Sequence, residues 1–426
     1  MAEKSCNGLT SADGGAWVVD ISTEAKLTIN PIRAIVDALK VEPNPDKEVI
    51  RLSIGDPTAY GNLPPSKLVS SAVAEEVENG QSNGYCLSFG SKAACSAVAE
   101  YYSTPEAPLT CSDVVLASGC SGALSMAINV LTNPGDNILI PCPGFSLYRC
   151  LASARQVEAR SYRLIPEKSW EIDLDNMESL IDENTKAIVV NNPSNPCGSV
   201  YTLQHLKDIA AVAYRRRVPI ISDEVYAGMA FHGTKFHSMA QVAPNQPILT
   251  CGGLAKKYLV PGWRLGWVFV HDQHHVLDLV REGLRKLSTQ ILGPCSLIQA
   301  ALPAIIRETP QEFFDNTIRH CEEAAGIAFG LLSEVPSLTP VMPSGAMYMM
   351  IGIKTDMLVD IDNDIQFTEK LMAEESVFCL PAQCFQYPDF FRIVLCVPMP
   401  MMSVACSRIS EFCHRHQRQT ITNGTH

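Results

Sequence analysis

The chain has 426 residues, of which 46% are hydrophobic and 18% are charged, a balance typical of a globular protein with a large buried core. Its formal net charge of −12 disfavours nucleic acid as a partner, because an acidic surface repels the phosphate backbone. The nearest approach to a metal pattern, Cys413 with His414 and His416, lacks the ligand spacing of a structural zinc site, so we expect no metal.

The cysteine and apolar patterns favour a cytoplasmic protein. Sixteen cysteines are scattered through apolar segments without a Cys-x-x-Cys pair, as expected for buried thiols in a reducing compartment. Residues 1–20 contain no Arg and no apolar run, unlike a targeting signal. The uncharged segment 114–135 is long enough to span a membrane, but small and polar residues at 118–122 interrupt it. We therefore interpret it as a strand, a turn and a helix, and we expect no membrane association.

The first 64 residues predict little regular structure. Residues 1–29 are polar and contain Gly, Ser and Asp, which is typical of a flexible N-terminal arm. Pro31 is suited to the first turn of a short helix. Residues 50–54 predict a strand, which Gly55 and Pro57 end.

Residues 65–308 alternate short apolar runs with longer helical patterns. The runs predict strands at 114–117, 137–140, 187–191, 219–222, 248–251 and 265–270, and the longer patterns predict helices at 66–78, 203–214 and 275–286. Strands that alternate with helices favour an α/β domain with a mostly parallel sheet covered on both faces. Functional sites of such sheets lie at the carboxyl ends of the strands.

The pattern changes at about residue 309. A long helix is predicted at 311–334, and then strands at 346–353 and 391–396 and helices near 365–375 and at 402–414. We therefore expect residues 309–426 to form a second, smaller α+β domain.

Asp223 and Tyr226 follow the predicted strand 219–222. At a strand end they can face one crevice, where a carboxylate can pair with a pyridinium nitrogen and a phenol can hydrogen-bond a ring oxygen. By itself the pattern is also typical of a strand followed by a helix cap.

Lys256 follows small residues at the end of strand 248–251, which suits a nucleophilic amine. Lys257 is the rival for that role, and we prefer Lys256 for its spacing to Arg264. Arg264 is flanked by Gly262 and Gly266, and such a rigid guanidinium is suited to a phosphate.

Gly119, Cys120 and Ser121 lie between a predicted strand and the helix that follows it. Small residues there expose backbone N–H groups at a helix N-terminus, which favours an anion. The loop has neither the G-x-G-x-x-G pattern of dinucleotide sites nor the G-K-[ST] of a Walker loop, so it suits one phosphate and not a nucleotide.

Two further polar residues are candidates for binding. Asn195 lies in a turn with two Asn-Pro pairs and can present its amide to a ligand, although a plain turn explains it as well. Arg392 opens an apolar strand, where a guanidinium is costly unless an internal salt bridge or a substrate carboxylate pairs with it. Taken together, the candidates supply the parts that pyridoxal phosphate (PLP) chemistry needs.

From about residue 30 to residue 413 the chain resembles the class I and II aminotransferases of fold type I. The stretches that carry the resemblance include Asn30-Pro31-Ile32-Arg33, Asn83-Gly84-Tyr85, Pro143-Gly144-Phe145 and residues 191–199 and 252–267. The longer stretches are most similar to animal members that act on tyrosine. The resemblance implies the PLP-dependent transferase fold, with a seven-stranded-type, mostly parallel sheet in residues 65–308 and a segment, 30–64, that contributes to the small domain and to dimer contacts.

The resemblance also implies residue roles. Lys256 would form the Schiff base and move a proton, Asp223 would pair with the pyridinium nitrogen, and Phe145 would stack on the ring. Tyr226 and Asn195 would bind the ring hydroxyl. The phosphate would be held by Gly119, Cys120, Ser121, Arg264 and, from the neighbouring subunit of an obligate homodimer, Tyr85. The substrate α-carboxylate would be bound by Arg392, Gly55 and Asn195.

The implied activity is ping-pong transamination of L-tyrosine, and of L-phenylalanine, with 2-oxoglutarate, giving 4-hydroxyphenylpyruvate and L-glutamate as the first step of tyrosine degradation. Three alternatives stay open. A β-lyase or synthase uses the same cofactor apparatus, and an aminotransferase for alanine or kynurenine shares the fold. A PLP-fold regulator is the non-enzymatic alternative, although residues 1–30 are too short and too acidic for the DNA-binding domain that it needs.

Overall fold

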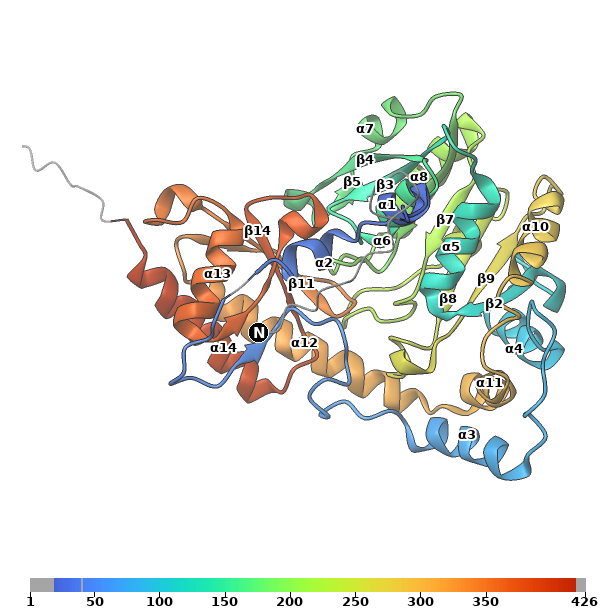
Figure 1. The fold of residues 1–426 in the computed structure, drawn as a ribbon, viewed down its shortest axis with the longest axis horizontal. Helices are drawn as coiled ribbons and strands as arrows, with labels where there is room; N and C mark the ends of the chain where they lie inside the picture. The colour runs from blue at the N-terminus through green and yellow to red at the C-terminus, as the bar shows by residue number, and fades with distance from the viewer. Residues whose placement is uncertain (1–18, 40, 419–426) are drawn as a thin grey trace, which may run out of the picture.

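The computed structural model describes residues 19–39 and 41–418, and its central element is an eight-stranded sheet (Figure 1). In spatial order the strands are β2 (Val114–Ser118), β9 (Leu265–His271), β8 (Ile248–Gly253), β7 (Ile220–Asp223), β6 (Thr185–Asn191), β3 (Asn137–Cys142), β4 (Glu158–Ile165) and β5 (Glu171–Ile172). The five strands from β8 to β4 pair in parallel, β9 runs antiparallel to β2 and β8, and β5 runs antiparallel to β4. The predicted mostly parallel α/β sheet is confirmed, with the two-residue β5 added to the seven expected strands.

Helices cover both faces of this sheet because its strands are apolar on both sides. Along β6, Ala187 and Val189 join one buried core and Ile188 and Val190 join the other. The first core packs against α5 (Gly119–Leu131), α6 (Leu147–Ala154) and α10 (Asp278–Ser288). The second core packs against α3 (Lys67–Asn79), α4 (Lys92–Tyr102), α8 (Leu203–Arg216), α9 (Met239–Val242) and α11 (Ser296–Glu308).

The C-terminal part of the chain builds a third core, separate from the two on the large sheet, around a small antiparallel sheet. Its strands, in spatial order, are β10 (Leu338–Pro340), β11 (Tyr348–Ile353), β14 (Phe390–Val394) and β13 (Leu380–Pro381). They pack with α12 (Gln311–Ser333), α13 (Asp364–Glu375) and α14 (Met399–Arg415). The long α12 extends from this core toward α11 and the large domain (Figure 1).

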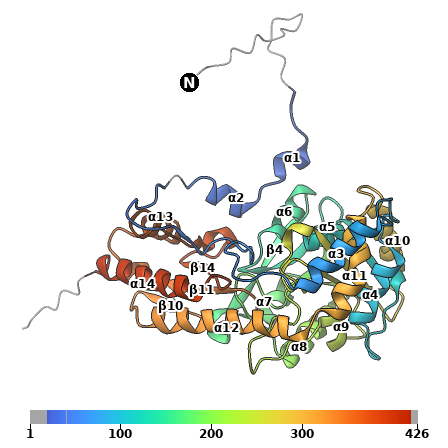
Figure 2. The same cartoon turned by 90° about the horizontal axis from the view of Figure 1, so that it is seen from below.

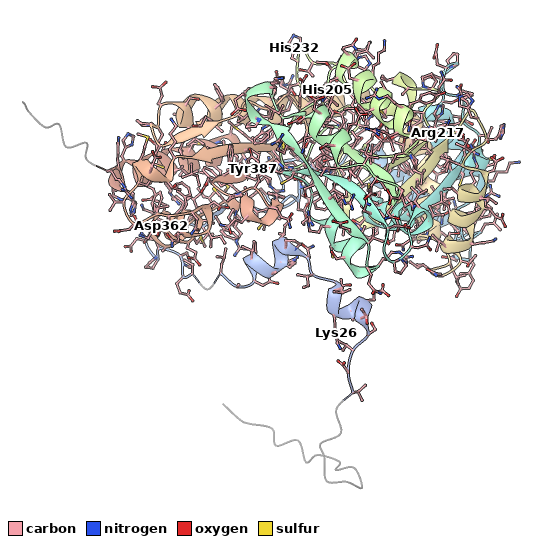
Figure 3. The ribbon with its side chains drawn as sticks, turned by 90° about the horizontal axis from the view of Figure 1, so that it is seen from above. Lys26, His205, Arg217, His232, Asp362 and Tyr387 are labelled. Atoms are coloured by element: carbon pink, nitrogen blue, oxygen red, sulfur yellow. The ribbon has the colours of Figure 1, made fainter. Side chains whose placement is uncertain are left out.

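The N-terminal part lies against both regions. Strand β1 (Ile50–Arg51) pairs in parallel with β12 (Val377–Phe378) of the small domain. Helix α1 (Thr23–Leu27) has no buried residue and projects from the body (Figure 2), and Lys26 lies away from the main body in Figure 3. Helix α2 (Pro31–Val36) packs Ile32, Ile35 and Val36 against a core of the large domain. Residues 1–18 of the predicted flexible arm lie outside the described residues.

Some predicted boundaries were wrong. The strand expected at 50–54 has two residues, because the chain from Ser53 onward leaves the sheet and lines a cavity. Helix α10 begins at Asp278 and not at 275, because His275 has a positive φ of 56°. The patterns did not predict α4, α6, α11 or β4. Segment 114–135 forms β2 and α5, as predicted, and none of the helices in the described part of the chain is long and apolar enough to cross a membrane.

Candidate active site

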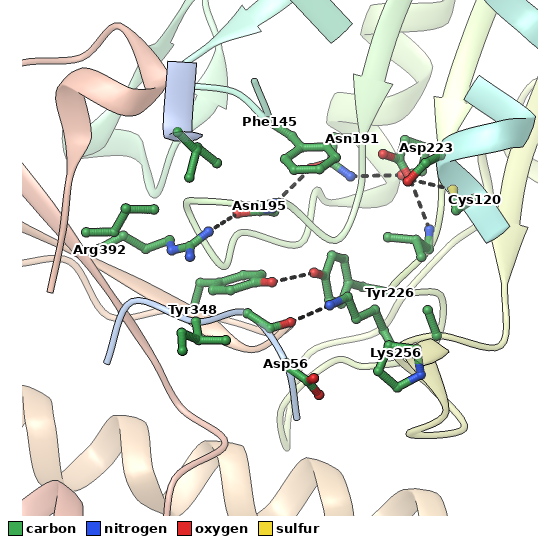
Figure 4. Close-up of a pocket in the computed structure, with 18 of the residues that line it drawn as sticks. Asp56, Cys120, Phe145, Asn191, Asn195, Asp223, Tyr226, Lys256, Tyr348 and Arg392 are labelled. Atoms are coloured by element: carbon green, nitrogen blue, oxygen red, sulfur yellow. Dashed lines mark hydrogen bonds between the residues drawn. The ribbon is translucent and has the colours of Figure 1, made fainter. Parts of the chain in front are cut away.

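A cavity of about 420 Å³ lies where the carboxyl ends of β6, β7 and β8 meet the small domain (Figure 4). The sequence-predicted residues that line it are Gly55, Cys120, Ser121, Phe145, Asn195, Asp223, Tyr226, Lys256, Arg264 and Arg392. Tyr85 does not line it; its side chain is on the surface, 95% exposed. The structure thus brings together side chains from segments that are more than 300 residues apart.

Asp223 ends β7 and lies at the inner wall of the cavity. Its Oδ2 accepts a hydrogen bond of 2.5 Å from the Tyr148 hydroxyl, and its Oδ1 accepts from Cys120 Sγ at 3.6 Å and from the Val225 N–H at 3.2 Å. Burial raises the pKa of Asp223, and these hydrogen bonds oppose the rise. The helix-cap alternative is wrong, because the next helix, α9, has Ser238 as its N-cap.

Lys256 and Lys257 are neighbours in the chain but lie in different places. Lys256 Nζ lines the cavity and donates to the Gly55 carbonyl oxygen at 2.5 Å. Lys257 Nζ donates to the Tyr101 hydroxyl at 2.5 Å and lies over the rings of Tyr101 and Phe314. Lys256 therefore supplies the amine in this cavity, whereas the amine of Lys257 lies outside it.

Arg264 and the start of α5 form a positive corner of the cavity. Arg264 follows a short 3-10 turn, Pro261–Trp263, and its guanidinium donates to the carbonyls of Pro261 and Ser118 at 3.2 and 3.1 Å. Gly119 has a φ of +70°, and a Cβ there would lie 2.5 Å from Arg264 Nη2. Only glycine permits this approach, which brings a guanidinium beside the free N–H groups of a helix N-terminus. That combination suits a phosphate dianion.

Aromatic side chains form two walls of the cavity. The hydroxyls of Tyr226 and Tyr348 are 2.7 Å apart, and both side chains are buried. Phe145 packs edge-on against Tyr148, with ring centroids 5.8 Å apart. In Figure 4, Phe145 lies on the upper side of the space and Tyr226 on the lower side. A flat ring can lie between these walls.

Arg392 of β14 is a buried cation at the small-domain side. Nη1 donates to Asn195 Oδ1 at 2.9 Å, and Nη2 donates to the Ser53 carbonyl at 2.7 Å. The guanidinium also lies 4.3 Å from the centre of the Tyr348 ring, and Nε is buried without a partner in residues 19–39 and 41–418. Burial lowers the pKa of Arg392. Among the described residues no carboxylate pairs with it, so the internal salt bridge is wrong, and the guanidinium can accept an anionic partner from the cavity.

The sequence patterns missed several residues of the cavity. Tyr348 lines the cavity and hydrogen-bonds Tyr226, and Ile32, Arg33 and Val36 of α2 also line it. Tyr148 lies behind the cavity and hydrogen-bonds Asp223. The stretch of family resemblance that begins at Pro143 continues through Ser146 and Leu147 to Tyr148, and this resemblance is the signal that could have found Tyr148. Tyr348 ends another such stretch, residues 343–348, whereas the position of α2 depends on tertiary contacts.

Comparison with known proteins gives a family match over most of the chain. Residues 47–409 match the sequence model of the family described as aminotransferase class I and II. Mouse tyrosine aminotransferase is 53% identical over 413 residues, which cover 97% of this chain and 91% of the mouse protein.

Two solved structures are similar to the present one over nearly their whole length. The crystal structure of tyrosine aminotransferase from Leishmania infantum has a TM-score of 0.91 and 33% identity, covering 95% of this chain and 100% of the other. Alanine aminotransferase from Pyrococcus furiosus has a TM-score of 0.87 and 28% identity, covering 93% of this chain and 100% of the other.

Proposed function

This chain belongs to the class I and II aminotransferases, and we propose that it transfers the amino group of L-tyrosine to 2-oxoglutarate. Enzymes of this family depend on pyridoxal phosphate. The observation that carries the proposal is the convergence of Lys256, Asp223 and Arg392 on one cavity. An amine, a buried carboxylate and an unneutralised guanidinium are the groups that transamination of an amino acid needs.

The residues of the cavity fit PLP. Gly119 leaves room for the Arg264 guanidinium beside the N-terminus of α5, which suits the phosphate. Asp223 is held by Tyr148 and can accept a hydrogen bond from a protonated ring nitrogen. Phe145 offers a ring face for stacking. When bound, PLP supplies an aldehyde that takes up the amino group and a ring that withdraws electrons from the substrate's Cα–H bond.

The chain's own residues orient the substrate and move the proton. Arg392 binds the α-carboxylate through the guanidinium edge that Asn195 and Ser53 hold in place. Asp223 keeps a positive charge on the ring nitrogen, since its carboxylate is buried and already oriented. The Lys256 amine lines the cavity beside the Gly55 carbonyl and, once neutral, would take the proton from the substrate's Cα and hold it for return.

The assignment of L-tyrosine is supported by relatives and by the cavity wall. The similar proteins from mouse and Leishmania infantum are tyrosine aminotransferases. Ile32, Val36 and Leu380 share the cavity with Arg392, and these apolar side chains suit an aromatic ring. L-Phenylalanine suits the same wall. The similarity to the alanine enzyme of Pyrococcus furiosus makes L-alanine the second candidate donor.

A panel of donors and acceptors tests the proposal. Purified holoenzyme would be assayed for kcat/KM with L-tyrosine, L-phenylalanine, L-alanine and L-kynurenine, each with 2-oxoglutarate. We expect L-tyrosine to give the largest value and L-glutamate to form in equal amount to the keto acid. A larger value for L-alanine, or release of pyruvate and ammonia from a β-substituted amino acid without an acceptor, would contradict the proposal.

We further propose that the enzyme is a homodimer in which Tyr85 reaches the phosphate site of the neighbouring subunit. Tyr85 is exposed on a loop with the apolar Leu87, and Ile291 and Leu292 are exposed on a second loop. The two loops are in contact, since a Cβ on Gly293 would lie 2.8 Å from the Ser88 carbonyl oxygen. An exposed apolar surface of this kind is typical of a subunit contact.

Two other parts of the interpretation are also proposals. We propose a division into an arm at 1–29, a segment at 30–64, a PLP-binding domain at 65–308 and a small domain at 309–426, and the pairing of β1 with β12 supports the assignment of the segment. A cytoplasmic location is supported by the many buried free thiols, which suit a reducing compartment.

A further inference from the structure

A second, very small cavity lies behind the strand end that carries Asp223. Its volume is about 10 Å³, which is close to the space that one water molecule needs. Glu224, Trp267, Tyr102 and Lys257 are among the residues that line it. Asp223 and Lys256 thus line the active-site cavity, whereas their chain neighbours Glu224 and Lys257 line the small one.

Glu224 faces the opposite side of the sheet from Asp223, as alternation along a strand requires. Its side chain is 2% exposed, and Oε1 accepts hydrogen bonds from the Ser222 hydroxyl at 2.8 Å, the Met239 N–H at 2.9 Å and the Ser238 hydroxyl at 3.1 Å. Oε2 is buried and has no partner in the described part of the chain. Oε1 is therefore hydrogen-bonded to the start of α9 and to Ser222, whereas Oε2 has no hydrogen bond in the described part of the chain.

Trp267 of β9 brings a matching unsatisfied donor to the same cavity. Its Nε1–H is buried and makes no well-oriented hydrogen bond among the described residues, although the Tyr102 hydroxyl of the same cavity lies near it. The indole lies close to β8, where a Cβ on Gly252 would be 2.7 Å from Nε1. A buried donor or acceptor without a hydrogen bond destabilises the folded state, and a water in the space between the two groups would give both a partner. One water can accept from Trp267 Nε1–H and donate to Glu224 Oε2.

We propose that the small cavity holds one ordered water that joins Glu224 to Trp267, and that Glu224 is a positioning residue that fixes the end of β7 from which Asp223 reaches the cofactor's ring nitrogen. The inference rests on the proposed function, because Asp223 has this partner only in a PLP enzyme. Glu224 acts on Asp223 in two ways. It ties the end of β7 to α9, and its charge adds to the negative field around the ring nitrogen.

The charge of Glu224 changes near neutral pH. Burial raises its pKa to about 7, opposed by the hydrogen bonds from Met239, Ser222 and Ser238. The titratable and charged groups that line the small cavity with Glu224 are Tyr101 and Tyr102 of α4 and Lys257 and Tyr258 of the loop after β8. Asp223, the preceding residue, and Cys251 of β8 lie on the other side of the sheet but are close enough for their charges to interact with that of Glu224. The Lys257 ammonium donates to Tyr101 and makes no ion pair with Glu224 among the described residues.

A pH titration of the holoenzyme tests the role of Glu224. The visible absorbance of the bound cofactor would be recorded against pH for the wild type, Glu224→Gln and Glu375→Gln. This absorbance reports protonation of the nitrogen that joins the cofactor to Lys256, and the pKa of that nitrogen responds to the charge on the ring and around it. Glu375 is the matched control, because it is another fully buried glutamate but pairs with Lys47 and Arg415 in the small domain. Loss of the nearby negative charge should lower the midpoint of the absorbance titration in Glu224→Gln by about half a pH unit to one unit. In steady-state assays of the same variant, kcat should fall and KM should stay unchanged. The midpoint of Glu375→Gln should stay at the wild-type value.

If Glu224→Gln does not fold, the inference can still be tested with the variant Trp267→Phe and with a crystal structure of the wild-type holoenzyme. Trp267→Phe removes the donor to the water and should move the midpoint in the same direction by a smaller amount. A high-resolution crystal structure of the holoenzyme should contain the water between Glu224 and Trp267. An unchanged midpoint in the foldable variants, or a dry cavity, would overturn the inference. Neither result depends on which amino acid is the donor, so failure of the proposed function is seen separately in the donor panel.

Discussion

The Tyr148 hydroxyl donates a hydrogen bond of 2.5 Å to Asp223 Oδ2, although the two residues are 75 positions apart in the chain. Both side chains are buried, and Tyr148 comes from α6 whereas Asp223 ends β7. The hydrogen bond holds the carboxylate in one orientation and stabilises its charged form against the cost of burial. Tyr148 therefore prepares Asp223 for a cationic partner.

Replacing Tyr148 by Phe should weaken the binding of PLP. A hydrogen bond to a charged group contributes about 1.5–3 kcal/mol, so the Kd of the cofactor should rise about 10- to 100-fold. A fluorescence titration of the apoenzyme with PLP measures this Kd. Tyr162→Phe is the matched control, because Tyr162 is also fully buried and its hydroxyl donates to the Val189 carbonyl at 2.7 Å, away from the cavity. Equal losses in the two variants would contradict the role given to Tyr148.

Substitutions of Lys256 and Lys257 should have very different effects. Lys256→Ala removes the amine of the cavity, and kcat for L-tyrosine should fall by at least about 10³-fold. Lys257→Met keeps an apolar chain over Tyr101 and Phe314, so kcat should stay within about threefold of the wild type. Steady-state kinetics measure both. Near wild-type turnover in Lys256→Ala would falsify the assignment of the catalytic amine.

Arg392→Lys should impair both substrates of the reaction. A lysine cannot donate to Asn195, to Ser53 and to a carboxylate as a planar fork does, and truncation of a buried charge contact costs about 2–5 kcal/mol. KM should therefore rise about 30-fold or more for L-tyrosine and for 2-oxoglutarate, since both carry a carboxylate next to the reacting carbon. Arg408→Lys, which changes an arginine that donates to the Glu48 and Glu375 carbonyls, should leave both KM values unchanged. A rise for one substrate only would show that Arg392 does not bind the shared carboxylate.

The proposed homodimer can be tested by mixing two impaired variants. If Tyr85 acts in the neighbouring site, a hybrid of Lys256→Ala and Tyr85→Ala subunits has one site with both residues intact. Half of the dimers are hybrids at equilibrium, so the mixture should regain about a quarter of the wild-type activity. Co-expressed and separately purified samples would be compared at the same concentration. If Tyr85 acts in its own subunit's site, mixing should give only the average of the two variants.

His205 should make the fold sensitive to acid. It lies on α8 (Figure 3), and its Nε2 accepts a hydrogen bond of 2.9 Å from the Ile172 N–H, which only the neutral ring can do. Burial lowers its pKa. The unfolded chain therefore binds more protons below the unfolded pKa of about 6.5, so the stabilisation is complete above that pH and is lost as pH falls through the folded pKa.

Urea unfolding at about pH 8 and at about pH 5 measures this loss. His205→Gln keeps an acceptor for the Ile172 N–H but does not titrate, so its free energy of unfolding should fall less between the two pH values than that of the wild type. An equal fall in both proteins would assign the acid sensitivity to other groups.

The parts of the site that depend on local pattern could be predicted from the sequence. Apolar runs identify strands, and a polar residue directly after such a run lies at the carboxyl end of the strand. This rule identifies Asp223 directly after strand 219–222, and Lys256 a few residues after strand 248–251, as candidate site residues. It also identifies the small residues 119–121 as a candidate anion site. The class of fold followed from the alternation of strands and helices, and the family from longer stretches of similar sequence.

Tertiary structure decided which of these side chains meet. Lys256 and Lys257 have nearly the same local sequence, and only the packing of Lys257 against Tyr101 separates them. Arg392 could have been part of a structural ion pair, but tertiary packing gives it uncharged partners, among them the Ser53 carbonyl 339 positions away, and no carboxylate in the described part of the chain. Local sequence fixes the conformation of a segment over a few residues, but a contact between distant segments depends on how the whole sheet and both cores pack.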